Sequence, residues 1–139
     1  MLTVSADLIP ICLRNYAHGD PGLEAAVELL IAHGVWLTRS DFLTECIHHG
    51  RHPSGEPYTW VDWELIAGFL DETGCASSEA RILSIAAELA GVDSGRPLGD
   101  LLSNLDARNT RLVIAAIAHN GRLDPAQHPE LTITTGASR

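Results

Sequence analysis

Helix-capping and helix-ending residues recur at short intervals along this chain, and this spacing limits the possible folds more than any other feature. Asp20 precedes Pro21, the favoured order for an N-cap and a first helical residue, and Gly34 follows one helix length later. Further segments of similar length end at Gly50, Gly74, Gly91 and Gly121. No repeat or low-complexity tract interrupts the pattern. The sequence therefore predicts an all-α fold, a compact bundle of five or six short helices.

Apolar residues spaced three and four apart give the position of each helix. The predicted helices span residues 21–34, 39–49, 60–73, 77–91, 97–105 and 107–120. The second is opened by Thr38 and Asp41, and the third by Thr59 and Asp62. The last helix is apolar on most of its sides, with Leu112, Val113, Ala116 and Ile117 facing inward, which predicts a central position in the bundle.

The two ends of the chain are less regular. A helix within residues 3–16 has to begin near Pro10, because proline would break the interior of a longer helix. We expect residues 1–125 to form a single helical domain and residues 126–139 to form an extended or partly disordered tail. The alternative for the ends is a minor β-pairing of Leu131–Thr134 with Leu2–Val4, because the first of these segments alternates and is rich in β-branched residues.

Length and hydrophobicity indicate a soluble, cytoplasmic protein. The chain has 139 residues, of which 45% are hydrophobic, enough to bury a core without metals or disulfides. The longest apolar run, Leu112 to Ala118, is far shorter than the roughly 18 to 20 residues of a membrane-spanning helix. Cys12, Cys46 and Cys75 are odd in number and lie among apolar residues, which favours free, buried thiols.

The charge of the chain is negative and concentrated in its middle. Residues 20–100 hold fourteen acids and four arginines, a net charge of −10, whereas the whole chain carries −9. Such a field repels phosphate backbones, so we expect no direct nucleic-acid binding. A protein partner or self-association is the expected mode of action, and an acidic inhibitor that mimics nucleic acid on a basic partner protein is an alternative.

Three histidines and a thiol gather within residues 46–52. His48, His49 and His52, with Glu45 nearby, are candidates for a metal site and hence for a metal-dependent hydrolase. Their spacing matches no common ligand pattern, and histidines in the last turn of a helix also interact favourably with its dipole. We therefore expect no metal, no cofactor and no catalytic residue, and keep the hydrolase as an alternative.

The segment Gly50–Tyr58 is the longest polar connection between the predicted helices, and binding residues are common in such loops. It offers Arg51 as a donor, His52 as a titratable ring, Glu56 as an acid and Tyr58 as an aromatic edge. Trp60 and Trp63 continue into an apolar helical stripe, which predicts that both are buried. The sequence thus indicates a small interaction or regulatory protein that acts through its acidic surface and the 50–58 loop.

Overall fold

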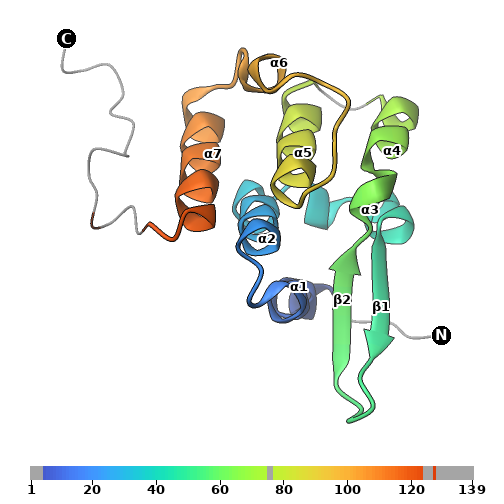
Figure 1. Ribbon diagram of the computed structural model, residues 1–139. Coiled ribbons are helices and arrows are strands. Elements are labelled where there is room, and N and C mark those ends of the chain that lie inside the picture. The colour runs from blue at the N-terminus through green and yellow to red at the C-terminus, as the bar shows by residue number, and fades with distance from the viewer. Residues whose placement is uncertain (1–4, 75–76, 124–126, 128–139) are drawn as a thin grey trace.

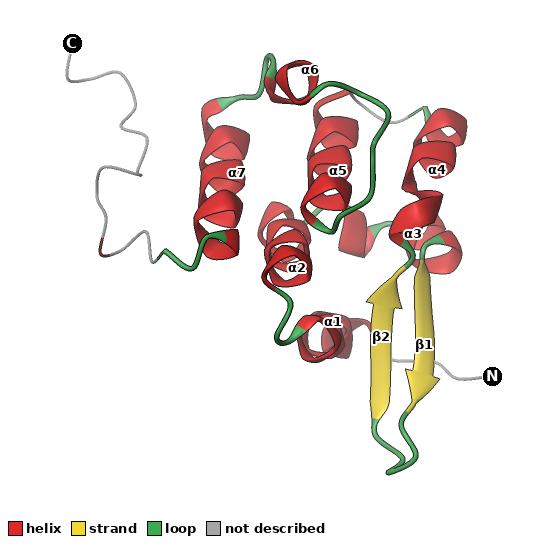
Figure 2. Ribbon diagram, in the orientation of Figure 1, coloured by secondary structure: helices red, strands yellow, loops and turns green. Residues whose placement is uncertain are grey.

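A mostly helical domain with one β-hairpin is found in the computed structural model, which describes residues 5–74, 77–123 and 127 (Figures 1 and 2). The α-helices are α1 (Ile9–Ala17), α2 (Pro21–His33), α3 (Ser40–Glu45), α4 (Ile66–Thr73), α5 (Ser77–Leu89), α6 (Leu98–Leu102) and α7 (Ala107–Asn120). Short 3-10 turns are η1 (Ala6–Leu8), η2 (Trp36–Thr38) and η3 (Trp63–Leu65), and the antiparallel strands are β1 (Ile47–Arg51) and β2 (Pro57–Val61). The helical class is confirmed, whereas the predicted 126–139 tail and terminal β-pairing lie outside the described residues.

The caps read from the sequence open and close α2 as predicted. The side chain of Asp20 accepts a hydrogen bond from the Leu23 amide at 3.1 Å, and Pro21 occupies the first turn. Gly34 ends the helix in the left-handed conformation with φ of 78°, which glycine adopts without steric cost. At α7, Asp106 accepts from the Asn109 amide at 2.7 Å in the same way. Local sequence chemistry thus determines both helix starts.

α2 lies at the centre of the bundle and packs against α1, α5 and α7 (Figure 1). Ala25 and Ala26 are completely buried, and these small side chains allow the neighbouring helices to approach closely. Gly22 lies against the carbonyl oxygen of Leu89 at the end of α5, where a Cβ atom would collide with that oxygen. The close packing of α2 therefore depends on residues with little or no side chain.

An aromatic cluster joins α3 and α4 to the rest of the bundle. The rings of Trp36, Phe42 and Phe69 have centroids 5.7 to 5.9 Å apart in tilted and edge-on arrangements. The indole nitrogen of Trp36 donates to the carbonyl oxygen of Glu79 on α5 at 3.0 Å. This buried bond satisfies the polar end of an otherwise apolar side chain.

Two of the predicted helices are wrong in part, because the chain forms a hairpin between them. The helix predicted over 39–49 ends at Glu45, and the one predicted over 60–73 begins at Ile66 after η3. Residues 47–51 include glycine and two histidines, which are poor helix formers, whereas Thr59, Trp60 and Val61 favour strands. Pairing these segments buries Ile47 against Val61 and keeps their backbone groups hydrogen-bonded.

The predicted central position of the last helix is also wrong. α7 packs on α2 and α5 at one side of the bundle, and Ile117 is 52% exposed (Figure 1). Val113 and Ala116 do face inward as predicted. The apolar side chains of α7 outnumber those that a single packed face can bury, so the surplus lies on the surface.

Near the N-terminus, Pro10 lies in the first turn of α1, so the helix begins near this proline, as the sequence requires. Among the described residues, no helix has the length and apolar character needed to cross a membrane. Cys12 and Cys46 are buried free thiols, as predicted, and Cys75 lies outside the described residues. Burial raises the pKa of Cys46 to about 12, so this thiol is unreactive.

The stability of the domain should fall in mild acid because His33 resists protonation in the folded state. His33 is buried at the end of α2, and its Nδ1 atom has no hydrogen-bond partner within the described part of the chain. Burial, and then the nearby Arg108 guanidinium, lower the pKa of this imidazole below its usual 6.5. The unfolded chain therefore takes up the proton first. The free energy of unfolding should decrease as pH falls below about 6.5, by at most about 1.4 kcal/mol per pH unit from this group.

Urea unfolding of the wild type and His33→Gln between pH 7.5 and pH 5.5 would measure this effect. The non-titrating variant should lose less stability on acidification, because every other group titrates equally in both proteins. Parallel curves for the two proteins would contradict the role given to His33.

The same substitution at two helical glycines should change stability in opposite directions. Gly22→Ala places a methyl group against the Leu89 carbonyl oxygen and should cost about 1 to 3 kcal/mol, because the backbone of α5 has to move. Gly68→Ala, in α4, meets no atom within 4 Å and should stabilise by up to about 1 kcal/mol through helix propensity. Thermal unfolding of both variants would check this, and a stabilising Gly22→Ala would refute the close approach.

Candidate functional site

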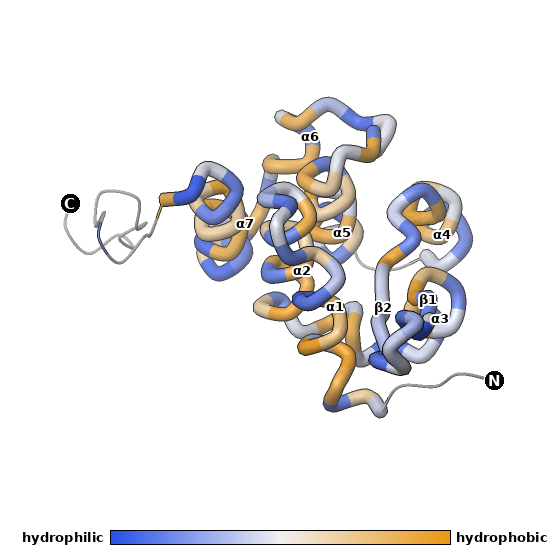
Figure 3. The backbone as a smooth tube through the Cα atoms, turned by 60° about the horizontal axis from the view of Figure 1, so that its bottom comes forward, coloured by the Kyte–Doolittle hydropathy of each residue, from blue (hydrophilic) through white to orange (hydrophobic). Residues whose placement is uncertain are grey.

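The β1–β2 hairpin extends from the helical body and has two different faces. Its register pairs His48 with Trp60, His49 with Thr59 and Gly50 with Tyr58. Because side chains alternate along a strand, Tyr58 and Trp60 lie on one face and Thr59 on the other. Thr59 is fully buried, whereas Tyr58 and Trp60 are half-buried. In Figure 3 the hairpin is largely blue and white, while α1, α2 and α5 carry orange segments.

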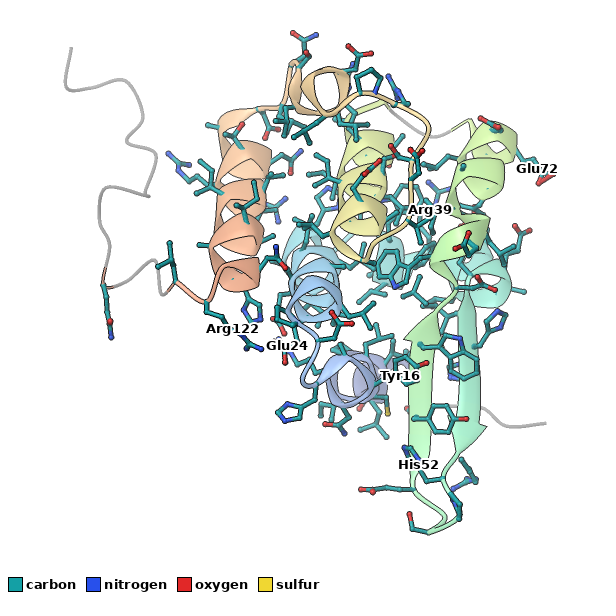
Figure 4. The ribbon with its side chains drawn as sticks, viewed as in Figure 1. Tyr16, Glu24, Arg39, His52, Glu72 and Arg122 are labelled. Carbon is teal, nitrogen blue, oxygen red and sulfur yellow. The ribbon has the colours of Figure 1, made fainter. Side chains whose placement is uncertain are left out.

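Three aromatic rings stack on the open face of the hairpin, and we call Tyr16, Tyr58 and Trp60 the aromatic patch. Tyr16, near the end of α1, is directed toward the strands (Figure 4). Its ring centroid lies 5.9 Å from that of Tyr58 and 5.7 Å from that of Trp60, while the two hairpin rings are 5.4 Å apart. The planes differ by at most 25°, which is a stacked arrangement. Tyr16 nevertheless remains 48% exposed.

Two histidines extend the aromatic patch along the hairpin. The ring of His52 lies 4.6 Å from that of Tyr58 near the turn, and the ring of His48 lies 5.4 Å from that of Trp60 near the body (Figure 4). The Nε2 atom of His48 is 3.1 Å from an Asp62 carboxylate oxygen, which holds the ring in place. The result is a continuous row of flat side chains with polar edges.

Gly50 allows Tyr58 to lie flat across the hairpin. A Cβ atom at residue 50 would be only 2.5 Å from the ring carbon Cζ of Tyr58 and 2.6 Å from its hydroxyl oxygen. The opposing glycine therefore leaves the space that the tyrosine ring fills. This pairing sets the position of Tyr58 relative to the other two rings.

α1 supports the hairpin by packing along β2. Leu13 and Ala17 are buried on α1, and Val61 is buried on β2. These residues, with Trp63 and Val27, line a hollow of about 160 Å³ that lies next to Tyr16 and Trp60. The aromatic patch therefore has an apolar hollow at its inner end.

The binding residues predicted from the sequence lie at the far end of the hairpin. The predicted 50–58 loop is wrong in extent, because residues 50–51 and 57–58 belong to the strands and only residues 52–56 form the turn. Arg51 donates to the Gly55 carbonyl oxygen at 2.7 Å, and the His52 amide donates to the Glu56 carbonyl oxygen at 2.9 Å. The rings of His52 and Tyr58 are in contact, while Arg51 and Glu56 are exposed.

The three candidate metal ligands point to different partners. His49 Nδ1 lies 3.0 Å from the Thr59 hydroxyl on the buried face, whereas His48 and His52 lie against the aromatic patch. Among the described residues, no three histidine, cysteine or acidic side chains are arranged to hold a metal ion. Glu45, which the hydrolase alternative included, is exposed at the end of α3.

From the sequence, one residue of the aromatic patch, Trp60, was misplaced, and another, Tyr16, was not singled out. Trp60 was predicted to be buried on a helix but is half-buried on a strand, while the predicted burial of Trp63 is confirmed. The alternation of Tyr58, Thr59, Trp60 and Val61, rich in aromatic and β-branched residues, was a signal for a strand. Tyr16 carried no local signal, because only the packing of α1 on β2 brings it to the hairpin.

A second, larger hollow lies between α2 and α7. It measures about 540 Å³ and is lined mainly by apolar side chains, among them Leu29 and Leu112. At its rim, the Glu24 carboxylate accepts from Arg122 at 3.3 Å and from the Gly19 amide at 2.9 Å (Figure 4). The Gly19 amide and His119 hold the pKa of Glu24 below its usual range. This charged carboxylate therefore links α2 to the end of α7.

Gly50→Ala should separate the rings of the aromatic patch without unfolding the protein. The added methyl group would push the Tyr58 ring away, since the end of a side chain moves more easily than the backbone. We expect weaker near-ultraviolet circular dichroism and a loss of roughly 1 kcal/mol in stability. Ser54→Ala, in the exposed turn, is the matched control and should change neither. An unchanged aromatic signal in Gly50→Ala would show that Gly50 does not position the ring.

Chemically, the aromatic patch offers flat apolar surface with polar edges, features that are also found in protein–protein interfaces. Aromatic residues of this kind are enriched where proteins bind one another. Beside the patch, the His48 ring is held by Asp62, and on the opposite face of the hairpin His49 contacts the Thr59 hydroxyl. Comparisons of this chain with protein-family models, with curated proteins and with solved structures found no match.

Proposed function

We propose that this protein is a small interaction module that recognises a protein partner through the aromatic patch on its hairpin. The observation that carries the proposal is the stacking of Tyr16, Tyr58 and Trp60 on a surface where Tyr16 stays 48% exposed. Rings that are fixed in place but open to solvent lose little conformational entropy when a partner covers them. A rigid, partly exposed aromatic surface is therefore well suited to binding.

The hairpin extends beyond the helices, with α1 beside β2 (Figure 2). Its turn, residues 52–56, is exposed throughout, and the aromatic patch lies where α1 meets the strands. Arg51 and Glu56 are exposed at the turn end of the hairpin, where they can contribute to the polar rim that surrounds an apolar contact. In this proposal the 50–58 segment contributes polar residues to the edge of the contact, and the aromatic patch forms its centre.

The acidic surface has a smaller part in this proposal, because several acids are already engaged within the molecule. Glu28 pairs with Arg14 at 2.8 Å, and Asp41 pairs with Arg39 at 2.7 Å. Glu24 pairs with Arg122, and the side chain of Asp20 caps α2. The ion pairs with Arg14, Arg39 and Arg122 offset part of the negative charge available for mimicking nucleic acid, so we favour aromatic recognition over an acidic inhibitor.

Replacing Tyr16 should weaken partner binding much more than replacing an equally exposed residue on the same helix. Phage-displayed random peptides selected on the wild-type protein would supply ligands, whose affinity is then measured for variants. Tyr16→Ala should lose at least about 2 kcal/mol, or roughly 30-fold, because it removes a central aromatic contact. Ile11→Ala, at a position 52% exposed on α1, is the matched control and should bind like the wild type.

The proposal would be refuted if selection enriches no peptide, or if the enriched peptides bind Tyr16→Ala and the wild type equally. Salt provides a second criterion. Aromatic recognition should depend weakly on ionic strength, whereas binding that weakens steeply with salt would favour the acidic-inhibitor alternative. Circular dichroism of each variant would establish that the fold is retained.

A further inference from the structure

Beside the aromatic patch, the structure contains a hollow whose lining carries no charge. It lies between α1, α2 and β2 and has a volume of about 160 Å³. Leu13 and Ala17 line it from α1, Val27 from α2 and Val61 from β2, and each of these four residues is at most 5% exposed. Tyr16 and Trp60 belong to both the hollow and the aromatic patch.

From this arrangement we infer that the hollow is an anchor pocket for one phenylalanine side chain of the protein partner. The inference rests on the proposed function and adds the chemistry of the group that is recognised. Size is the first argument. This partly open hollow has a volume close to that of an enclosed apolar cavity, about 150 Å³, that binds benzene in another protein, so its size matches one aromatic ring.

Size also distinguishes a side chain from a free ligand. Pockets for small molecules usually measure about 300 to 1,000 Å³, well above the volume of this hollow. A benzene-sized ligand would in addition make no use of Tyr58 and His52, which continue the surface outward from the hollow. A peptide that inserts one ring and lies across these residues uses the whole surface.

The lining determines the chemistry of the occupant. The residues around the hollow offer no charged group to compensate a buried charge, which excludes ionised side chains. Its Tyr16 and Trp60 rings can contact an incoming ring edge to face, a geometry that adds to the energy of apolar burial. Together these features favour phenylalanine over a charged side chain and over an aliphatic one.

Toluene, the side-chain analogue of phenylalanine, is a direct probe of the pocket. In a titration followed by ¹H–¹³C NMR, the methyl signals of Leu13, Val27 and Val61 should shift and saturate. Ala17→Leu should abolish these shifts, because its larger side chain fills the hollow from α1. Ala32→Leu, which lines the separate hollow between α2 and α7, is the matched control and should leave them unchanged. Shifts that are absent, or confined to Leu29 and Leu112, would overturn the inference.

A blocked peptide, Gly-Gly-Phe-Gly-Gly, distinguishes a partner's side chain from a small free ligand. It should shift the pocket methyl signals and also the ring signals of Tyr58 and His52. The same peptide with alanine in place of phenylalanine should bind at least about tenfold more weakly. A peptide whose shifts stop at the pocket, or that binds equally well without its ring, would overturn the inference.

The two hypotheses can fail separately. If the selected peptides lose affinity for Tyr16→Ala but bind Ala17→Leu normally, the aromatic patch binds a partner and the anchor pocket is wrong. If neither variant weakens binding, the proposed function fails as well. Should Ala17→Leu not fold, as judged by its amide NMR spectrum, Val27→Ile fills part of the same hollow and should weaken toluene binding.

Discussion

The close packing of α2 against α1, α5 and α7 is the constraint on which the rest of this structure depends. It depends on residues of α2 with little or no side chain: Ala25 and Ala26 are completely buried, and Gly22 lies against the carbonyl oxygen of Leu89. Larger residues such as Leu29 and Leu30 then fill the spaces between the helices and are fully buried or nearly so. Because α1 rests on α2, this packing also fixes the direction in which Tyr16 points.

The hairpin in turn depends on α1. A two-stranded ribbon is at best marginally stable in water, so β1 and β2 need a surface to pack against. α1 supplies it along β2, and Thr59 and Val61 are buried while Tyr58 and Trp60 stay half-open. One helix therefore has two roles: it stabilises the hairpin, and it contributes the third ring of the surface that the hairpin presents.

Features that short-range chemistry determines could be predicted from the sequence, and those that depend on distant contacts could not. Asp20, Gly34 and Asp106 act within one helical turn of their own position, so α2 and α7 were placed correctly. The hairpin requires residues 47–51 to meet 57–61, and its strands contain spacings that also fit a helix. In the site, His52 and Tyr58 could be identified because polar loops often carry binding residues. Tyr16 could not, because it comes from a helix far away in the sequence.

The proposed anchor pocket also concerns the balance between stability and function. A chain selected only for stability could fill a hollow of about 160 Å³ with a larger residue at Ala17, since each buried methylene adds roughly 0.8 kcal/mol. Likewise, leaving Tyr16 48% exposed forgoes apolar burial that a neighbouring side chain could provide. The unfilled hollow and the exposed Tyr16 ring are both found where Tyr16 meets Trp60. Proteins commonly depart from the best packing where a surface has another use, and this coincidence is the physical reason for proposing a binding surface there.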